Sequence, residues 1–552
     1  MTATAELAIV RSQEKRWEQW IQKHRESIAA GREGEGMGVG SLALLLPLYC
    51  HPQSIYYENE ELPELLMQMV DKYLATQLPS GCISLVNCNI DSPPDTAFAV
   101  PFVAMLSDLA AQSGLPGTAE VARGLETFLE RAKPCVLTGG IHTPNHRWVM
   151  AGALAKMYER YKDEAFKERA FQFLNEGLDI TDYGEWTERS NGVYNGACDL
   201  HLYDVWQVFG HQPAYEAIVS NLGMMRYLLH PNDDLVTEYS GRQDRNTPMK
   251  MNEWYYIITR LMASRDSAFA GLAAIADRST PKGSYCLLYH MLHPSEMELP
   301  ESFEPLQENY TLLLGEHNVT PVPSKVPYRG KLVEHPHGAS VLRHRQGKLS
   351  MTVMAGQPEL LALRWGEARL HALKLGAGWF GVAGVAFPTI RSLGANRYEL
   401  EIALEGCYWQ PLPDELTRSA NGRYVDMPNH LREKTHISYL PIKLEVELFD
   451  NGVDLTIVSE GINNIYLQAA LAFNAAGELS GEGLSQTDLP HIQFLASGEA
   501  VYTAGADRIH VSPGALEHSD AVIRNDVPDP SSKNIMINMV TPVRRTIQIR
   551  GY

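Results

Sequence analysis

Two neighbouring segments, NHRWVMAGALAKMYERY (residues 145–161) and EAFKERAFQFLNEGL (164–178), decide the fold expected for the first half of the chain. In both, apolar residues recur at three- and four-residue spacing, which is the pattern of an amphipathic helix. Similar pairs of segments lie before and after them. The other pairs are 91–111 with 118–132, 194–210 with 213–229, and 251–264 with 267–277. Helical hairpins are therefore expected up to about residue 310.

The first helix of each pair begins at an unusual polar motif. Asp95, His146, Tyr194 and Arg245 recur at these starts, at intervals of 51, 48 and 51 residues. Such a period with two helices predicts stacked helical hairpins, which form an open solenoid or close into an (α/α) toroid. In a toroid the motif-bearing helices are the inner ring, and their motifs meet at one end of a common funnel. We therefore predict an (α/α)6-like toroid over residues 1–322.

The texture of the chain changes after about residue 325. Short alternating runs rich in Val, Ile, Tyr and Thr, such as RYELEIALEGCYW (397–409), are separated by Gly, Asn, Asp and Pro. The Asp450-Asn451-Gly452 turn between two such runs is a strong hairpin signal. An antiparallel β-sandwich is expected over residues 331–552, joined to the helices by the Pro-bearing linker 319–330. The fold class is therefore α+β with two domains.

Composition excludes several functions. The chain has 552 residues, 47 Lys plus Arg against 66 Asp plus Glu, and a net charge of -19. That field repels nucleic acid and anionic lipid, so an acidic substrate would need a local cluster of arginines. No signal peptide is visible at the N-terminus, and the apolar runs are shorter than the roughly 20 residues that span a bilayer. A cytoplasmic protein without nucleic-acid or membrane partners is expected.

The seven cysteines are scattered, odd in number, and form neither CxxC pairs nor a zinc-like spacing. They predict reduced, mostly buried thiols and no metal site. The positions are Cys50, Cys82, Cys88, Cys135, Cys198, Cys286 and Cys407.

Two motifs at the predicted inner-helix starts lie before residue 150. DSPPDTAF (91–98) brings Asp95, which in a purely structural interpretation caps a Pro-broken turn. HTPNHRWV (142–149) concentrates hydrogen-bond donors and an aromatic platform at one helix start. Its candidate substrate-binding residues are His142, Asn145, His146, Arg147 and Trp148.

Two further motifs follow. WTERSNGVYN (186–195) brings Glu188, Arg189, Asn191 and Tyr194, and VTEYSGRQDRNT (236–247) brings Glu238, Arg242, Asp244 and Arg245. An arginine–carboxylate surface network is the alternative for the second motif. The arginines at positions 147, 242 and 245 would form the positive patch that the acidic chain otherwise lacks, which favours a carboxylated or sulfated substrate. Glu185 is a reserve candidate for the acid, whereas Asp199, His201, Tyr203 and Asp204 are expected to be structural.

The motifs TPNHRWV, GEWTERSNGVYN and TEYSGRQDR, within helical hairpins followed by a sandwich, resemble those of toroid-plus-sandwich enzymes that act on uronic-acid polysaccharides. Two groups compete, the heparinase II/III-like lyases and the β-glucuronidases of glycoside hydrolase family 154. Resemblance to the lyases implies a Tyr/His pair that removes the proton alpha to the uronate carboxyl, which Asn145, His146 and Tyr194 could provide. The HxHxDxxSF-type segment of many lyases is replaced by RLHALKLGAGWFG (369–381), which keeps only His371.

Glycoside hydrolysis needs two carboxyl groups, one protonated and one ionised. Glu188 and Glu238 supply this pair, each directly after a threonine and closely followed by arginines, and His146 could orient or protonate one of them. The expected function is an exo-acting β-glucuronidase that needs no cofactor and takes a uronic-acid-containing oligosaccharide. A uronate lyase is the first alternative, a non-catalytic helical-repeat scaffold the second, and a homo-oligomer is possible.

In this expectation the uronate carboxylate is held by arginines and the remaining residues line the sugar pocket. The arginines are Arg147, Arg189, Arg242 and Arg245, and the pocket residues are Asp95, His142, Asn145, His146, Trp148, Asn191, Tyr194 and Asp244.

Overall fold

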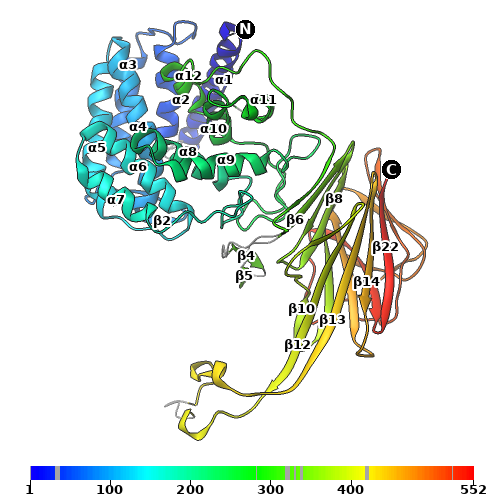
Figure 1. The fold of residues 1–552 in the computed structure, drawn as a ribbon. Helices are drawn as coiled ribbons and strands as arrows, with labels where there is room; N and C mark the ends of the chain where they lie inside the picture. The colour runs from blue at the N-terminus through cyan, green and yellow to red at the C-terminus, as the bar shows by residue number, and fades with distance from the viewer. Residues whose placement is uncertain are drawn as a thin grey trace. The chain divides into compact units, whose positions relative to one another are not determined.

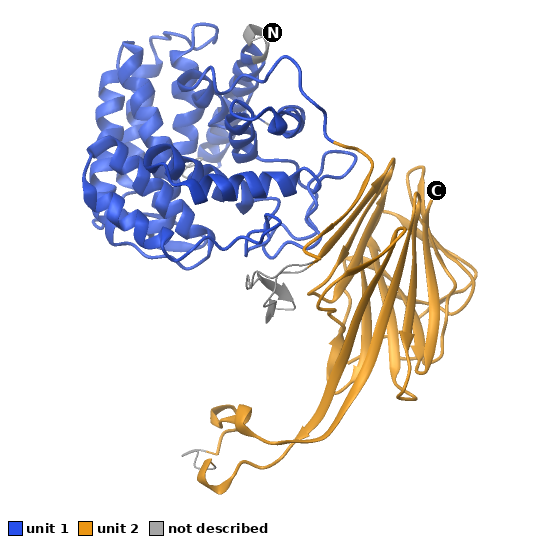
Figure 2. Cartoon of the chain, viewed as in Figure 1, with its two compact units in different colours: residues 1–306 blue, residues 307–552 orange. Residues whose placement is uncertain are grey.

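The computed structural model describes residues 2–30, 38–280, 282–316, 324–328, 331–335, 340–416, 422–524 and 526–552. The chain divides into two compact units, residues 1–306 and 307–552 (Figure 2). The first unit is helical and the second is built of strands (Figure 1). The expected order, helices first and antiparallel strands second, is confirmed at this level.

The helices of the first unit pack in the predicted pairs: α4 on α5, α6 on α7, α8 on α9 and α10 on α11. A short hairpin of two strands, β1 (Ile83–Leu85) and β2 (Asn89–Ser92), precedes α4. The helices are α1 (Thr2–Ala29), α2 (Val39–Cys50), α3 (Leu62–Ala75), α4 (Pro93–Ser113), α5 (Thr118–Thr138), α6 (Asn145–Tyr161), α7 (Glu164–Leu174), α8 (Tyr194–Phe209), α9 (Gln212–Met225), α10 (Glu253–Ala263), α11 (Ala270–Ser279) and α12 (Cys286–Leu292).

The motif-bearing helices also pack against one another. Each helix of the series α2, α4, α6, α8, α10 and α12 contacts the next one in the series. The last helix, α12, also contacts α2 and α4, so this row of helices closes on itself. Within the described residues, α4 alone is long and apolar enough to cross a membrane, and most of it is buried in the helical unit. Its apolar character therefore belongs to the core of this unit.

The predicted helix starts are close to those observed. Helix α6 begins at Asn145 and α8 at Tyr194, at the polar motifs. At α4 the cap differs from the structural interpretation of DSPPDTAF, because Ser92 is the N-cap and its hydroxyl accepts from the backbone N–H of Asp95. The Asp95 carboxylate is therefore left to other partners.

The cysteine prediction is wrong at two positions. Cys82, just before β1, forms a disulfide with Cys135 of α5, with the two Cα atoms 5.6 Å apart. Cys50, Cys198 and Cys286 are buried thiols as expected, whereas Cys88 is exposed and Cys407 is partly exposed. The spacing of 53 residues between the paired cysteines gives no sign of their contact, because it arises where the segment just before the hairpin packs on α5.

The second unit contains two large sheets that enclose a common core. One sheet has the strand order β17-β18-β21-β15-β9-β8-β7-β6-β3, with β10 on β9, and the other has the order β11-β12-β13-β14-β22-β20-β19-β16. Pairing is antiparallel except between β18 and β21. The Asp450-Asn451-Gly452 turn joins β13 to β14 and pairs Phe449 with Gly452, as predicted.

The strands of this unit are β3 (Tyr310–Leu314), β4 (Ser324–Tyr328), β5 (Lys331–His335), β6 (Val341–Gln346), β7 (Leu349–Met354), β8 (Glu359–Trp365), β9 (Ala368–Trp379), β10 (Val382–Gly384), β11 (Arg391–Gly394), β12 (Arg397–Trp409), β13 (Lys434–Phe449), β14 (Gly452–Ser459), β15 (Tyr466–Asn474), β16 (Glu478–Ser480), β17 (Leu484–Gln486), β18 (Ile492–Leu495), β19 (Ala500–Ala504), β20 (Asp507–Ser512), β21 (Ser532–Val540) and β22 (Val543–Gly551).

The division between the units falls earlier than the expected boundary at 322/331. Strand β3 pairs with β6 and so belongs to the second unit, which begins at residue 307. Of the expected linker 319–330, residues 324–328 form β4, which pairs with β5, and the rest lies outside the described residues.

Candidate functional site

Two helix starts and two loops bring polar residues together in the helical unit. Asn145 and His146 begin α6, Tyr194 begins α8, and Glu188 and Arg242 lie in the loops that precede α8 and α10. Hydrogen bonds and ring contacts join four of these side chains. We call Asn145, His146, Glu188, Tyr194 and Arg242 the polar cluster.

Glu188 is the anchor of the polar cluster. Its carboxylate accepts hydrogen bonds from the Asn145 side-chain amide, at 2.9 Å for each oxygen, and from the Asn145 backbone N–H at 3.1 Å. Arg242 Nη1 lies 3.0 Å from Glu188 Oε2. Burial raises the pKa of Glu188, while Arg242 and the Asn145 donors oppose that shift. Both carboxylate oxygens are therefore already engaged by protein donors.

Arg242 is the cation of the polar cluster that reaches solvent. Its side chain keeps 27% of its surface exposed, although it pairs with Glu188, which keeps only 7%. Its guanidinium carbon lies 4.6 Å from the centre of the Tyr194 ring. The Tyr194 hydroxyl accepts a hydrogen bond of 3.1 Å from Gln243. A positive charge and a phenol thus lie side by side at the start of α8.

His146 is buried and neutral at pH 7. Burial lowers the pKa of His146 to about 4; the charges of His142 and Arg242 lower it further, and that of Asp95 raises it. The exposed His142 ring stands edge-on to it, with centroids 4.6 Å apart. Among the described residues, its buried Nδ1 atom has no hydrogen-bond partner. The site therefore holds a neutral imidazole, which has one ring nitrogen able to accept a proton at neutral pH.

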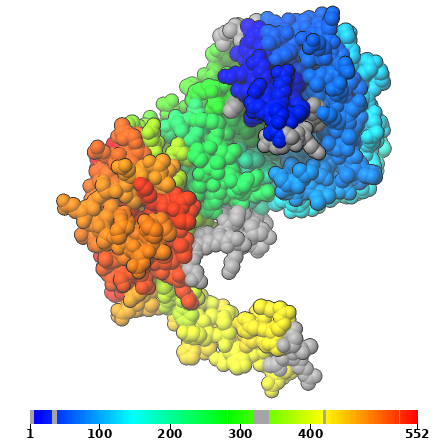
Figure 3. Space-filling view, turned by 180° about the vertical axis from the view of Figure 1, so that it is seen from behind, coloured from blue at the N-terminus to red at the C-terminus, as the bar shows by residue number. Residues whose placement is uncertain are grey.

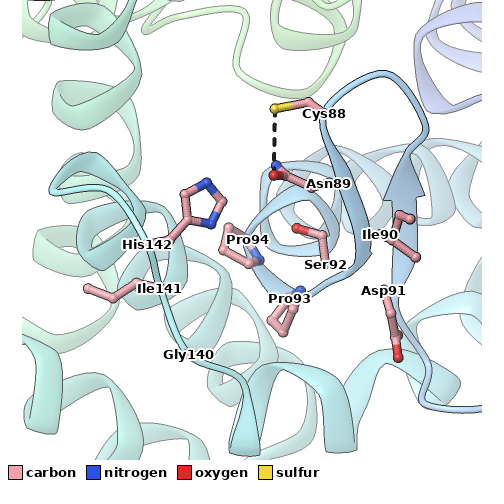
Figure 4. Close-up of a pocket in the computed structure, with 10 residues that line it drawn as sticks. All are labelled: Cys88, Asn89, Ile90, Asp91, Ser92, Pro93, Pro94, Gly140, Ile141 and His142. Carbon is pink, nitrogen blue, oxygen red and sulfur yellow. Dashed lines mark hydrogen bonds between the residues drawn. The ribbon is translucent and has the colours of Figure 1, made fainter. Parts of the chain in front are cut away.

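Asp95 bonds Asn89 and Ser92, two of the residues that line a pocket of about 510 Å³; Figure 4 shows the lining residues. Its carboxylate accepts a hydrogen bond of 2.7 Å from Asn89 and another from Ser92. Figure 4 shows the β1–β2 hairpin and the 140–142 segment facing each other across this space. The pocket is lined by Cys88, Asn89, Ile90, Asp91, Ser92, Pro93, Pro94, Gly140, Ile141 and His142.

Several residues of the site do not stand out in the sequence. Asn89 is one, because it occurs in a short strand with no motif, although it lines the pocket and donates to Asp95. Phe98 and Trp254 are stacked with centroids 5.8 Å apart, and the Phe98 ring stands edge-on to His146 at 6.3 Å. The Gln243 amide bonds Tyr194. Asn89 and Phe98 lie within six residues of Asp95, which was the available signal.

Arg189 does not reach the surface of the site. It is completely buried, its Nε atom lies 2.7 Å from Glu185, and its guanidinium packs over the Tyr239 ring at 4.7 Å. Glu185, the reserve candidate for the acid, is the partner in this contact and is only 1% exposed. Because both side chains face inward, their observed role is to hold the loop that carries Glu188.

Asn191 and Asp244 are also internal. Asn191 donates 2.9 Å to the Val236 carbonyl, and Asp244 accepts from the hydroxyls of Ser190 and Ser240 and from the Gly192 backbone N–H. These bonds join the loop before α8 to the loop at 236–247. Both residues therefore tie the loop that carries Glu188 to the loop that carries Arg242.

Glu238 is buried next to His230, with Oε1 and Nε2 3.0 Å apart. The proposed catalytic pair thus consists of two carboxylates that are each held by protein groups. Asp199, His201 and Asp204 are buried within α8, in agreement with the structural role expected for them. Burial alone lowers the pKa of His201 to about 3.

Arg147 and Trp148 share one acidic partner, Asp179. Arg147 Nη2 lies 2.8 Å from the Asp179 carboxylate. The same carboxylate accepts a hydrogen bond of 3.2 Å from the Trp148 indole N–H. The Arg147 guanidinium carbon packs over that indole, 4.4 Å from the ring centre. Arg245 lies one turn beyond Arg242 and donates its backbone N–H to the Arg242 carbonyl at 3.1 Å. Within the described residues, no group of three His, Cys, Asp or Glu side chains is arranged to hold a metal ion.

No protein-family model matches the chain, and no curated protein sequence does. Solved structures give distant likenesses. Heparan sulfate lyase HepC from Pedobacter heparinus has a TM-score of 0.46 and 11% identity, over 93% of this chain and 75% of that one, and a mutant of it has a TM-score of 0.47. Chondroitin AC lyase from Streptomyces coelicolor A3, solved with chondroitin sulphate, has a TM-score of 0.47 and 11% identity, over 100% and 79%. A GH127 β-L-arabinofuranosidase from Geobacillus stearothermophilus T6 has a TM-score of 0.32 and 9% identity, over 100% and 96%.

Proposed function

We propose that the chain is a carbohydrate-active enzyme, and specifically a lyase that cleaves uronate-containing polysaccharide by β-elimination. One observation carries this choice: Glu188 is occupied in holding Asn145 and Arg242. The groups left to act on a substrate are a cation, a neutral imidazole and a phenol, all at one end of a ring of helices. We also propose that the helical unit is the predicted (α/α) toroid.

The elimination would use these groups as follows. Arg242 pairs with the uronate carboxylate and neutralises the charge that otherwise opposes removal of the C5 proton. His146 accepts this proton, the C4–C5 double bond forms, and the bond from C4 to the glycosidic oxygen breaks. Tyr194 donates its phenolic proton to the departing oxygen. No water is consumed, and solvent restores the two proton positions afterwards.

Asn145 supports binding through the atom that Glu188 leaves free. Its Oδ1 is buried, and among the described residues no group donates to it. An unsatisfied buried acceptor costs free energy, which a sugar hydroxyl would recover by donating a hydrogen bond. Asn145 is therefore assigned to positioning the uronate ring, with Glu188 fixing the amide.

The pocket beside Asp95 suits the sugar that adjoins the uronate in the polysaccharide. A pocket of about 510 Å³ exceeds the volume of one pyranose ring and lies in the range of small-molecule sites. Its Asp91 and Asn89 side chains offer hydrogen bonds to hydroxyls, while Ile141 and Pro93 offer apolar contact to ring C–H groups. Because Asp91 and Asp95 are acidic, an uncharged sugar fits here better than a second uronate.

Hydrolysis by an exo-acting β-glucuronidase is the second candidate, and one observation favours it. Burial raises the pKa of Glu188, which is the shift a general acid of a glycosidase requires. In that mechanism Glu188 would protonate the leaving oxygen and Glu238 would act as the base or nucleophile. Arg242 would keep its role as the ligand of the uronate carboxylate.

Two substrates distinguish these candidates. The full chain is incubated with a soluble polyuronate and, separately, with an aryl β-glucuronide. We expect a new ultraviolet-absorbing unsaturated uronate from the first and no aryl alcohol from the second. Release of the aryl alcohol would support the hydrolase instead. Absence of product in both assays would favour the non-catalytic scaffold.

A further inference from the structure

A long two-stranded ribbon extends from the body of the second unit. Strands β12 and β13 continue beyond the other strands of their sheet, and the segment that joins them forms the end of the ribbon (Figure 1). In Figure 3 this segment, in yellow, stands out from the atoms of the unit as a separate projection. We call residues 408–439 the arm; residues 417–421 within it are not described.

The arm has an ordered structure of its own. It contains three short helical turns, η2 (Asp414–Leu416), η3 (Tyr424–Asp426) and η4 (Asn429–Leu431). The Arg432 guanidinium donates to the Gln410 carbonyl at 3.0 Å and to Asn429 at 2.8 Å, and Asn429 donates to the Tyr424 carbonyl at 2.7 Å. These contacts are polar, and Leu412 is the single buried apolar residue in the described part of the arm.

Apolar side chains are concentrated on the outside of the arm. Eight of the 24 exposed large apolar residues in the described part of the chain lie there. Val425 is 72% exposed, Tyr408 62% and Tyr424 61%. Scattered exposed apolar residues are ordinary, but so many within one ribbon mark an interaction site. The eight are Tyr408, Trp409, Leu416, Tyr424, Val425, Leu431, Ile437 and Tyr439.

The edges of the ribbon are open as well. Strand β11 covers β12 only as far as Glu399, and β14 covers β13 only from Lys443 onward. Between these points and the Trp409–Lys434 pair, the two strands pair with each other and with no other strand of the described sheets, although Trp379 donates to the Leu404 carbonyl and Ser459 to the Pro441 carbonyl. Open strand edges are templates for another strand, and an isolated two-stranded ribbon is marginally stable in water.

We propose that the arm joins two copies of this chain through a twofold interface. The same strand edge from two copies pairs antiparallel about a twofold axis, so both open edge and apolar surface are covered at once. The area is sufficient: eight half-exposed side chains offer roughly 700 Å² per copy, close to the ~800 Å² per partner of a standard interface.

Charge also favours a second copy. The chain carries a net charge of -19, so most of its surface repels another copy. The described part of the arm carries four acidic and three basic residues, a net of -1, so two arms approach one another with little repulsion. The acidic residues are Asp414, Glu415, Asp426 and Glu433, and the basic ones are Arg423, Arg432 and Lys434.

Sedimentation velocity of the full chain tests the proposal. The chain of 61.5 kDa is expected to sediment as a dimer at micromolar concentration. The double variant Trp409→Ser/Tyr439→Ser is expected to sediment as a monomer that keeps the circular-dichroism spectrum of the wild type, because both side chains are exposed. Val425→Asp, at the end of the arm, is expected to weaken the dimer at least tenfold and serves if the double variant misfolds.

Two matched controls keep the test specific. Tyr466→Ser and Val86→Ser remove exposed apolar side chains outside the arm, at 43% and 91% exposure, and are expected to leave the dimer intact. A wild-type chain that stays monomeric at micromolar concentration would overturn the proposal. A dimer that persists in all arm variants would overturn it too, as would a wild-type monomer that floats with anionic or neutral lipid vesicles.

Discussion

Asn145 and Glu188, 43 residues apart in the chain, meet through three hydrogen bonds of 2.9 to 3.1 Å. The bonds link the start of α6 to the loop before α8, and Arg242 adds a cation to the same carboxylate at 3.0 Å. A buried carboxylate with this many donors fixes its neighbours more readily than it transfers a proton. We therefore propose that Glu188, expected to be one of the two catalytic carboxyl groups, is the anchor of the polar cluster.

The first prediction concerns the anchor. In Glu188→Gln the side chain loses its charge and one acceptor oxygen, so Asn145 and Arg242 are held less firmly. We expect kcat on polyuronate to fall about 10- to 100-fold, as is usual for groups that orient a reacting residue, with the product unchanged. Steady-state kinetics measure this loss. Glu126→Gln, which removes a carboxylate on α5 that pairs with Arg160, is the control and should leave kcat unchanged.

The second prediction concerns the proton donor. Tyr194→Phe keeps the ring beside Arg242 and removes only the hydroxyl. Loss of a general acid should lower kcat about 10²- to 10⁴-fold with little change in KM. Tyr158→Phe removes an exposed hydroxyl on the outer part of α6, where it bonds Glu164, and should have no effect. Equal activity of the Tyr194 variant and the wild type would remove Tyr194 from the mechanism.

The third prediction is a pH profile. His146 must be neutral to accept a proton, and burial lowers its pKa to about 4. The value of kcat/KM is therefore expected to stay level as pH falls from 7 to about 5, and then to fall tenfold per pH unit below about 4. Assays from pH 3.5 to 7, with return to pH 7 to check reversibility, measure the profile. An acid limb near pH 6.5 would show that His146 is not the base.

The charges around His146 make this profile adjustable. Arg242 lowers the pKa of His146, so Arg242→Gln should move the acid limb to higher pH in whatever activity remains. Asp95 raises that pKa, so Asp95→Asn should move the limb to lower pH. Shifts in these opposite directions are not expected from a loss of folding.

The fourth prediction concerns the disulfide. Cys82–Cys135 closes a loop of 53 residues that contains the β1–β2 hairpin and Asn89. The paired change Cys82→Ser/Cys135→Ser should lower the free energy of unfolding by about 2 to 4 kcal/mol. Chemical denaturation without reductant measures this loss. Cys88→Ser, at an exposed thiol in the same hairpin, should leave stability unchanged, and a reductant should abolish the difference between wild type and the paired variant.

The helical and strand halves could be predicted because their periodicities are local. Apolar spacing located α4 to α11, and the Asp450-Asn451-Gly452 turn located a hairpin. The motif period also predicted that Asn145, Glu188 and Arg242 would approach one another. Periodicity is a property of neighbouring residues, so it is visible without the fold.

Side-chain partners could not be predicted in the same way. Arg189 was expected to grip a substrate, yet its pairing with Glu185 and its packing on Tyr239 bury it completely. The Cys82–Cys135 disulfide depends on the segment before the hairpin, which packs on α5, and the Asn89–Asp95 bond depends on the hairpin itself, which packs on α4. A sequence motif shows which chemistry its residues could perform. Only the packing of the fold shows which of these side chains remain available to a substrate.

The most direct test of β-elimination is the mass of the products. A defined uronate oligosaccharide is cleaved by the full chain, and both fragments are weighed by mass spectrometry. Elimination predicts that the two fragments together weigh the same as the substrate, with the uronate fragment carrying the double bond. Fragments that together weigh one water molecule more than the substrate would contradict the account and restore Glu188 as the acid of a hydrolase.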